Sequence, residues 1–323
     1  MGFAYYLETI RPEVDERIEQ VVVGEPTLDA DTLLPLLRGG KRLRAGLVLM
    51  IHDALTLHYE AHRDRAVDLA CAVELAHAAS LIVDDMLDED VERRGQETLH
   101  VKQGNKAAML NAIGILSLPY DLAGQLSSTY TAWLGETQRR MTSGVFKELW
   151  RQKGVSASKL YDIIVTQKTG ELFGLAAAYG AASIMETPAD TAIVQALRQY
   201  GLHVGKAMQI ADDIADIARA ARGEGSTVPG SEMLLLRCVT VDGLAKELVS
   251  DVKDGSPKPG KIKDLWQREG VQRRLSNLVA DECLRAQAAL DRLEIKLLVR
   301  DVVTLKTLPG EIAGMMVREG GVE

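Results

Sequence analysis

The sequence predicts an all-α protein formed by a single domain over residues 1–323. Apolar residues recur at helical spacing in one segment after another, and no segment has the period-two alternation of a half-buried strand. Aromatic residues make up only 4% of the chain while Ala and Leu dominate, which favours helix over sheet. The hydrophobic share of 46% is ample for a buried core, and no repeat or Pro/Ser-rich linker divides the chain.

The expected helices follow one another along the chain. Residues 5–22 alternate apolar and charged side chains, and a short amphipathic helix over residues 27–38 ends at the stop signal Gly39-Gly40. The apolar helices over residues 42–59 and 65–90 are expected to be buried. Further helices are expected over residues 106–142, with interruptions at Gly114 and Pro119, and over residues 158–179, 189–221 and 271–298. The stretches 223–230 and 255–260 are expected to be loops.

Charge and cysteine usage exclude several classes of function. The net charge of −8 argues against a general nucleic-acid binder, which needs a basic surface. Cys71, Cys238 and Cys283 are odd in number and lack metal-ligand spacing, so we expect reduced thiols in a cytoplasmic protein. The N-terminal residues are too acidic for a signal peptide, and no apolar run approaches the roughly 18 residues of a membrane span. We therefore expect no integral membrane segment.

Two aspartate clusters carry the strongest chemical signal. Each is a DDxxD within a helical segment: Asp84, Asp85 and Asp88 in SLIVDDMLDEDVERRG, and Asp212, Asp213 and Asp216 in MQIADDIADIAR. Residues four apart share a helix face, so the first and last aspartates of each cluster project together. Like charges this close are unfavourable in apolar helices unless cations neutralise them. Because Mg²⁺ takes carboxylates, phosphates and water as ligands, two such faces opposite one another would form a Mg²⁺-diphosphate clamp.

Basic residues suited to phosphate binding lie at three further places. GGKRLR, residues 39–44, places three cations beside flexible backbone at a helix start, where free N–H groups and the dipole favour anions. Arg93 and Arg94 follow the first cluster, and tandem Arg residues can bind phosphate oxygens bidentately. Lys168 and Thr169 follow an apolar turn and offer a cation and a hydroxyl.

Each of these features also has an ordinary structural interpretation. The first cluster would then be a solvated acidic helix face with an Arg partner. The second would belong to a core helix that is salt-bridged through Lys206 or Arg219. GGKRLR would be a solvated basic helix cap. For Lys168-Thr169 taken alone, the structural interpretation is the favoured one. Two DDxxD sequences, each behind an apolar turn, favour the functional interpretation over these alternatives.

The segments GGKRLR, HAASLIVDDMLDEDVERRG, KTGELF and MQIADDIAD occur in the order found in trans-isoprenyl diphosphate synthases, also called polyprenyl synthetases. The chain resembles this family from about residue 35 to about residue 220, and it is most similar to geranylgeranyl diphosphate synthases. The resemblance implies a fold with a deep central cavity, a homodimer, and three Mg²⁺ ions bound together with an allylic diphosphate. The implied reaction joins isopentenyl diphosphate to an allylic prenyl diphosphate. Ionisation of the allylic C–O bond, attack by the isopentenyl double bond and loss of a proton would proceed away from water.

The resemblance also implies roles for individual residues. Mg²⁺ would be ligated by Asp84, Asp88 and Asp212, and through bound water by Asp216, with support from Asp85 and Asp213. The diphosphate of isopentenyl diphosphate would be bound by Lys41, Arg44, His77 and Arg94. The allylic diphosphate would be faced by Arg93, Lys168 and Lys206. The reacting allyl group would be lined by Thr169 and Gln209.

Product length is predicted from the residues just before the first aspartate. In the family, bulky aromatics four or five residues upstream close the cavity early. Here Ala79 and Ser80 are small, and so is Ala76 one turn further down. A helical turn of about 5.4 Å is roughly the length of an isoprene unit, so we expect a product of twenty carbons or more.

The chain departs from the family after the second cluster. In RGEGSTVPG, Thr227 and Pro229 match a Lys-x-Thr-x-Pro element, but Gly225 stands where its Lys is expected. This change leaves two alternatives to a prenyl-elongating enzyme. One is a terpene cyclase or atypical prenyl-coupling enzyme on the same fold, and the other is a non-catalytic partner subunit. Such subunits usually lose aspartates, whereas this chain keeps all of them.

Overall fold

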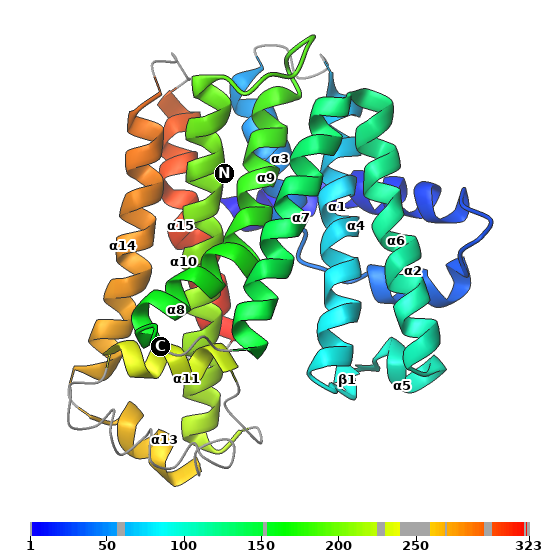
Figure 1. The fold of residues 1–323 in the computed structure, drawn as a ribbon. Coiled ribbons are helices and arrows are strands. Elements are labelled where there is room, and N and C mark those ends of the chain that lie inside the picture. Colours follow the sequence, from blue (N-terminus) through cyan, green and yellow to red (C-terminus); the bar gives the residue numbers. More distant parts are fainter. Residues whose placement is uncertain are drawn as a thin grey trace. The chain divides into compact units, whose positions relative to one another are not determined.

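The computed structural model describes residues 2–56, 62–150, 154–224, 230–239, 259–268, 270–293, 299–319 and 321. The chain forms two compact units, Met1–Glu136 with Leu175–Gln195, and Thr137–Gly174 with Ala196–Glu323. The helices α7 (Ser128–Leu149), α9 (Glu171–Ala182) and α10 (Ala192–Arg222) each have residues in both units (Figure 1). The all-α prediction is confirmed, since the only strands among the described residues are the two of one short hairpin, each two residues long.

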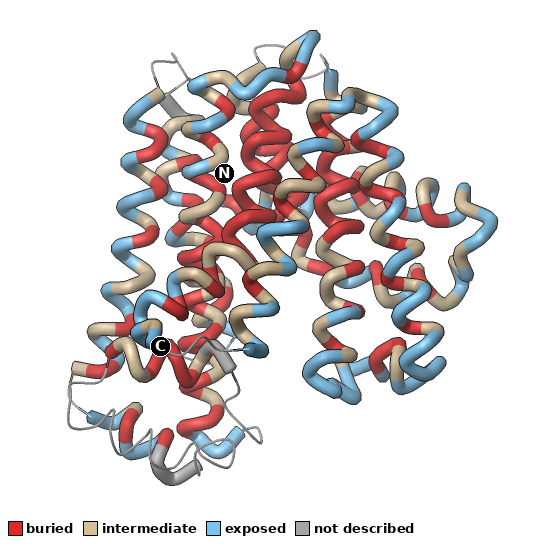
Figure 2. The backbone as a smooth tube through the Cα atoms, viewed as in Figure 1, coloured by how far each residue is buried: buried red, intermediate tan, exposed pale blue. Residues whose placement is uncertain are grey.

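The helix α4 (Arg63–Leu87) is the central element of the first unit. It packs against α1 (Phe3–Val23), α3 (Leu43–Leu55) and α6 (Asn105–Leu126). Because neighbours surround it, α4 is buried over most of residues 66–76, whereas residues 77–87 alternate between buried and more exposed positions (Figure 2). The apolar stripe of α1 explains its place, because Phe3, Leu7 and Ile10 recur at helical spacing and are all buried.

Shorter elements complete the first unit. The helix α2 (Ala30–Leu37) begins at Asp29, whose side chain accepts a hydrogen bond from the Thr32 amide and so caps the helix. After α4 the strands β1 (Glu92–Arg93) and β2 (Gln96–Glu97) form an antiparallel hairpin. The helix α5 (Leu99–Gln103) then leads into α6.

The second unit holds the segment that carries Lys168. The helix α8 (Ala157–Ile164) passes into a π-helix, η1 (Val165–Gly170), which continues as α9. Buried apolar side chains of α8 and α10 form one core with those of three further helices. These helices are α11 (Gly230–Val239), α13 (Pro259–Trp266) and α14 (Val271–Asp291), and α15 (Val299–Glu319) packs against α14.

Some expected boundaries were wrong. The helix α6 runs through Gly114 and Pro119, and the chain breaks only at Ser127, whose backbone is extended. Pro119 is buried, so packing of the helix offsets the hydrogen bond that proline cannot donate. Of the expected loops, residues 225–229 and 255–258 lie outside the described residues, whereas residues 259 and 260 begin α13.

Two described helices have the length and composition of a membrane span. The mean hydropathy is 1.7 for α4 and 1.2 for α6 over the most apolar 18-residue window. The window of α4 is 67% buried, as expected for the core helix of a folded domain, whereas that of α6 is 39% buried. The difference arises because α6 leaves Met109, Leu110 and Ile113 exposed. The absence of an integral membrane segment stays a prediction.

Candidate functional site

The GGKRLR segment joins α2 to α3 through left-handed backbone. Gly39 has a φ of 81°, and Arg42, the N-cap of α3, has a φ of 57°, which is uncommon for a residue with a side chain. Arg42 is turned inward and is 6% exposed, whereas Lys41 is half-buried. Burial lowers the pKa of Arg44 to about 10, and nearby Glu74 opposes this change, so the guanidinium stays charged at neutral pH.

Arginine charges converge on His77 in the first unit. Burial lowers the pKa of His77 well below its usual range, and the charges of Arg44, Arg94 and Arg93 lower it further. Arg94 has a φ of 54°, and its Nη1 lies 3.6 Å from the position that a Cβ on Gly40 would occupy. The chain after α4 therefore returns to the GGKRLR turn. Three of the residues predicted to bind isopentenyl diphosphate, Arg44, His77 and Arg94, thus lie in one positively charged region.

The first aspartate cluster lies at the C-terminal end of α4. Asp88 is the C-cap and its amide bonds to the Asp84 carbonyl at 2.9 Å, so the two residues keep helical i, i+4 geometry. Asp84 is half-buried and Asp88 is exposed. Asp85 is 5% exposed and accepts a 2.5 Å hydrogen bond from Arg93 Nε. Burial raises the pKa of Asp85 and Arg93 opposes the shift.

In the second cluster, Asp213 faces the interior of its unit. It is 1% exposed and accepts hydrogen bonds from Tyr161 Oη at 2.7 Å and from Gln209 Nε2 at 2.8 Å. Gln209 Oε1 in turn accepts a 2.8 Å bond from Thr169 Oγ1. Burial raises the pKa of Asp213 to about 7, and the two hydrogen bonds oppose the shift. Thr169, Gln209 and Asp213, all predicted as site residues, therefore form one hydrogen-bonded chain.

Asp216 and Asp212 lie on the more open side of α10. Both are half-buried, and Asp216 forms an ion pair with Arg219 one turn on. Burial raises the pKa of Asp216 and Arg219 opposes this. The alternative interpretation of this helix named Arg219 as a partner, and that pairing is present. Asp216 keeps 36% of its side chain exposed, so the pair leaves it open to further ligands.

The π-helix η1 carries Lys168 and Thr169. Single π-turns within α-helices are frequent at functional sites. Lys168 Nζ lies 2.8 Å from Glu148 Oε2 of α7, and the side chain of Gln167 accepts a hydrogen bond from Lys147. Two adjacent residues of α7 therefore hold η1. The close approach depends on Gly144, where a Cβ would lie only 2.8 Å from the Lys168 amide nitrogen.

Lys206 is directed toward α8 and α14. Its side chain is 6% exposed, and its ammonium nitrogen lies 2.6 Å from Asp162 Oδ1 and 3.1 Å from Glu282 Oε1. Glu282 Oε2 also lies 2.6 Å from His203 Nδ1. Through these contacts Lys206 of α10 links α8 and α14 within the second unit. Contact between Lys206 and the allylic diphosphate stays a prediction. The diphosphate would compete for the ammonium with the carboxylates of Asp162 and Glu282.

The residues predicted to limit product length line α4. Ala76 and Ala79 are each 2% exposed, and Ser80 is half-buried. The Ser80 hydroxyl donates a 2.7 Å hydrogen bond to the His77 carbonyl, a local bond within the helix. The small side chains are therefore packed, and a larger residue at 79 would need new space.

The donor sets of both clusters fit a hard divalent cation. No group of three His, Cys, Asp or Glu side chains that could hold a metal occurs among the described residues. Mg²⁺ does not require one, because it often takes one or two carboxylates and completes its shell with water and phosphate oxygens. At the end of α4, Asp84 and Asp88 also meet the negative pole of the helix dipole. A cation bound there would relieve that unfavourable arrangement.

Several polar partners in the site were missed from the sequence. Tyr161, Glu148 and Glu282 each bind a predicted site residue, but they lie 20 to 76 residues from their partners and in no motif. Glu232 of α11 was also missed. Burial raises its pKa to about 9, and the charge of Asp213 contributes to the shift. No local pattern in the sequence marks these residues.

Comparison with known proteins places this geometry in context. A family model described as polyprenyl synthetase matches residues 30–228. The geranylgeranyl diphosphate synthase of Pseudescherichia vulneris is 30% identical over 230 residues, covering 65% of this chain and 71% of that protein. The nonaprenyl diphosphate synthase of Mycobacterium tuberculosis is 31% identical over 241 residues, covering 72% of this chain and 69% of that protein.

Solved structures share the fold. A crystal structure of a geranylgeranyl pyrophosphate synthase has a TM-score of 0.80 at 21% identity, covering 95% of this chain and 98% of that one. A polyprenyl synthase from Caulobacter crescentus, complexed with calcium and isoprenyl diphosphate, has a TM-score of 0.75 at 24% identity. That likeness covers 98% of this chain and 96% of the other.

Proposed function

Because this chain belongs to the polyprenyl synthetase family, we propose that it condenses isopentenyl diphosphate with an allylic prenyl diphosphate. It is a trans-prenyltransferase, and the product is geranylgeranyl diphosphate or a longer trans chain. The observation that carries the proposal is the extent of the family match. Residues 30–228 include the GGKRLR turn, both aspartate clusters and the Lys168-Thr169 pair.

We propose that the two aspartate clusters ligate the Mg²⁺ ions of a single bound allylic diphosphate, with three ions in all. The ligands would be Asp84, Asp88, Asp212 and Asp216. The bound cations would neutralise the departing diphosphate and so favour ionisation of the allylic C–O bond. Asp85 and Asp213, which face inward, would hold their helices in place through Arg93 and Tyr161.

The remaining cations serve the two diphosphates in this proposal. Arg44, Arg94 and Lys41 would bind isopentenyl diphosphate, with a neutral His77 donating or accepting a hydrogen bond beside them. Lys168 would exchange its contact with Glu148 for the allylic diphosphate. Thr169 and Gln209, which are already hydrogen-bonded to one another, would line the space around the reacting allyl group.

The same proposal extends to product, domain and assembly. The buried Ala76 and Ala79 support a product of twenty carbons or more, because no aromatic closes the channel at these positions. Three helices continue from one unit into the other, which supports a single catalytic domain. The exposed apolar face of α6, with Met109, Leu110 and Ile113, supports a homodimer, and we expect a cytoplasmic enzyme.

A product assay tests the function. Purified protein with Mg²⁺, isopentenyl diphosphate and dimethylallyl, geranyl or farnesyl diphosphate should release diphosphate and yield longer prenyl chains by mass spectrometry. Chelation of Mg²⁺ should stop the reaction. Failure to elongate any primer would remove the proposal, and a hydrocarbon formed from one prenyl diphosphate alone would favour a cyclase.

The shared metal site needs its own test. Asp84→Asn and Asp212→Asn should each weaken Mg²⁺-dependent binding of an allylic diphosphate. If both residues serve one bound diphosphate, the double variant should lose less than the sum of the single losses. Strictly additive losses would indicate separate sites.

A further inference from the structure

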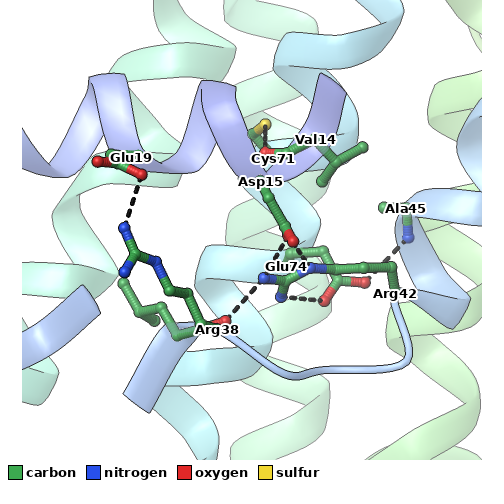
Figure 3. Close-up of polar contacts among 9 residues, drawn as sticks. Val14, Asp15, Glu19, Arg38, Arg42, Ala45, Cys71 and Glu74 are labelled. Atoms are coloured by element: carbon green, nitrogen blue, oxygen red, sulfur yellow. Dashed lines mark hydrogen bonds and ion pairs between the residues drawn. The ribbon is translucent and has the colours of Figure 1, made fainter. Parts of the chain in front are cut away.

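Arg42 of the GGKRLR turn is buried and contacts protein groups from three helices. Its Nε donates a 2.7 Å hydrogen bond to Asp15 Oδ1 of α1, and its Nη2 donates one of 2.7 Å to the Leu37 carbonyl at the end of α2. Its Nη1 lies 3.5 Å from Glu74 Oε2 of α4. Figure 3 shows the guanidinium between the carboxylates of Asp15 and Glu74. One side chain therefore ties together three helices that surround the turn.

Glu74 carries this connection into the start of α3. The carboxylate is 5% exposed, and its Oε1 accepts a 3.0 Å hydrogen bond from the Ala45 amide. That amide belongs to the first turn of α3, where backbone N–H groups have no partner within the helix. Glu74 thus links the guanidinium of Arg42 to the helix start on which Arg44 lies (Figure 3).

Arg42 also shapes the backbone around Lys41. Its own φ of 57° reverses the chain between Lys41 and Leu43. A Cβ on Gly40 would lie 3.1 Å from Arg42 Nη1 and 3.6 Å from Arg94 Nη1, so the glycine backbone rests directly on the two guanidinium groups. The position of Lys41 therefore depends on a conformation that is uncommon for arginine and is held by the contacts of its side chain.

We propose that Arg42 is a positioning residue that sets Lys41 and Arg44 for the diphosphate of isopentenyl diphosphate without touching it. This inference rests on the proposed function. A planar guanidinium can satisfy three acceptors in fixed directions, whereas a lysine ammonium is a flexible point charge. The turn should therefore need arginine and not merely a positive charge at position 42.

Kinetics of Arg42→Lys in the full-length protein test the proposal. We expect the KM for isopentenyl diphosphate to rise between about tenfold and a hundredfold, since small misplacements of binding groups have effects of this size. The KM for farnesyl diphosphate and the kcat at saturation should stay within about twofold. Arg38→Lys is the matched control, because Arg38 pairs with Glu19 at 2.9 Å in the same region but is 60% exposed. It should leave both KM values unchanged.

Two further measurements keep the test decisive. If Arg42→Lys does not fold, Asp15→Ala removes one partner of Arg42 at a position that is 32% exposed, and it should raise the same KM selectively. Equilibrium dialysis of isopentenyl diphosphate alone separates this inference from the proposed reaction, because it requires binding and no elongation. An unchanged KM, or an equal rise for both substrates in a folded variant, would overturn the assignment.

Discussion

Asp213 Oδ2 accepts a 2.7 Å hydrogen bond from the Tyr161 hydroxyl, which joins the middle of α10 to α8 in the core of the second unit. Both side chains are buried, at 1% and 5% exposure. The bond places one carboxylate of the second cluster away from solvent, while Asp212 and Asp216 stay half-buried. The cluster therefore divides into one internal residue and two that are partly exposed.

Tyr161→Phe should remove this bond and leave the Asp213 carboxylate short of a donor. We expect the free energy of unfolding to fall by about 1–3 kcal/mol, measured by urea denaturation. With one stabilising donor lost, the pKa of Asp213, already raised to about 7 by burial, should rise further, so the cluster loses negative charge. Half-maximal activity should then need more Mg²⁺.

Tyr200→Phe is the matched control for that substitution. Tyr200 is fully buried in the same unit and donates a 2.7 Å hydrogen bond to the Leu305 carbonyl. It should lower stability to a similar degree without changing the Mg²⁺ dependence. An identical Mg²⁺ dependence for both variants would contradict the role given to the Tyr161–Asp213 bond.

Lys206→Met should break a buried ion-pair network. Glu282 loses one of its partners and keeps its contacts with His203 and Arg285, so the free energy of unfolding should fall by about 1–3 kcal/mol. The double variant with Glu282→Gln should be less destabilised than the sum of the two single changes. A folded Lys206→Met enzyme with normal stability and a raised KM for the allylic diphosphate would instead favour substrate binding by Lys206.

Stability should fall as the pH drops below about 6.5, the ordinary pKa of histidine. Burial lowers the folded-state pKa of His77 and of His52, so the unfolded chain takes up protons there that the folded chain does not. The slope reaches about 1.4 kcal/mol per pH unit for each such proton. His77→Gln should show a shallower loss between pH 7.5 and pH 5.5 in thermal unfolding. An unchanged slope would exclude His77 as a contributor.

Gly144→Ala should displace the π-helix η1. The new Cβ would lie 2.8 Å from both Gln167 Cβ and the Lys168 amide nitrogen, so backbone must move. We expect kcat to fall by about tenfold or more, although alanine is the better helix former. Gly310→Ala in α15 is the control, because nothing lies within 4 Å of its Cβ position, and it should raise stability slightly. Full activity of Gly144→Ala would show that η1 tolerates the shift.

Ala79→Phe should shorten the product. In the proposed function Ala79 faces the growing chain, so a phenyl ring should take up part of that chain's space. Because the side chain is 2% exposed, the substitution should also cost about 1–3 kcal/mol through overpacking. Mass spectrometry of products from farnesyl and geranyl diphosphate measures the change. Ala78→Phe, on a neighbouring and half-buried face of α4, should leave the product length unaltered. Equal lengths from wild type and Ala79→Phe would refute the prediction.

Local patterns in the sequence were sufficient where the controlling interaction is local. The i, i+4 relationship of Asp84 and Asp88 follows from helical periodicity alone and is kept even though Asp88 is the C-cap. The end of α2 before Gly39 was also predicted from a local property, because glycine readily adopts the left-handed conformation found there. The interruption expected at Pro119 is absent, because proline inside α6 is tolerated once neighbouring helices pack around it. The chain breaks instead at Ser127, which was not predicted.

The amino-acid sequence by itself determined the helical class, the two aspartate faces and the family, because periodicity and motif spacing are properties of neighbouring residues. Only the tertiary structure decided that Arg42 and Lys206 are turned toward carboxylates and that Asp213 is the internal aspartate. The partners of these residues lie 27 to 76 positions away, as Asp15, Glu282 and Tyr161 show. A buried charged side chain is stable only beside an opposite charge or a hydrogen-bond partner, and the fold decides which distant residue supplies it.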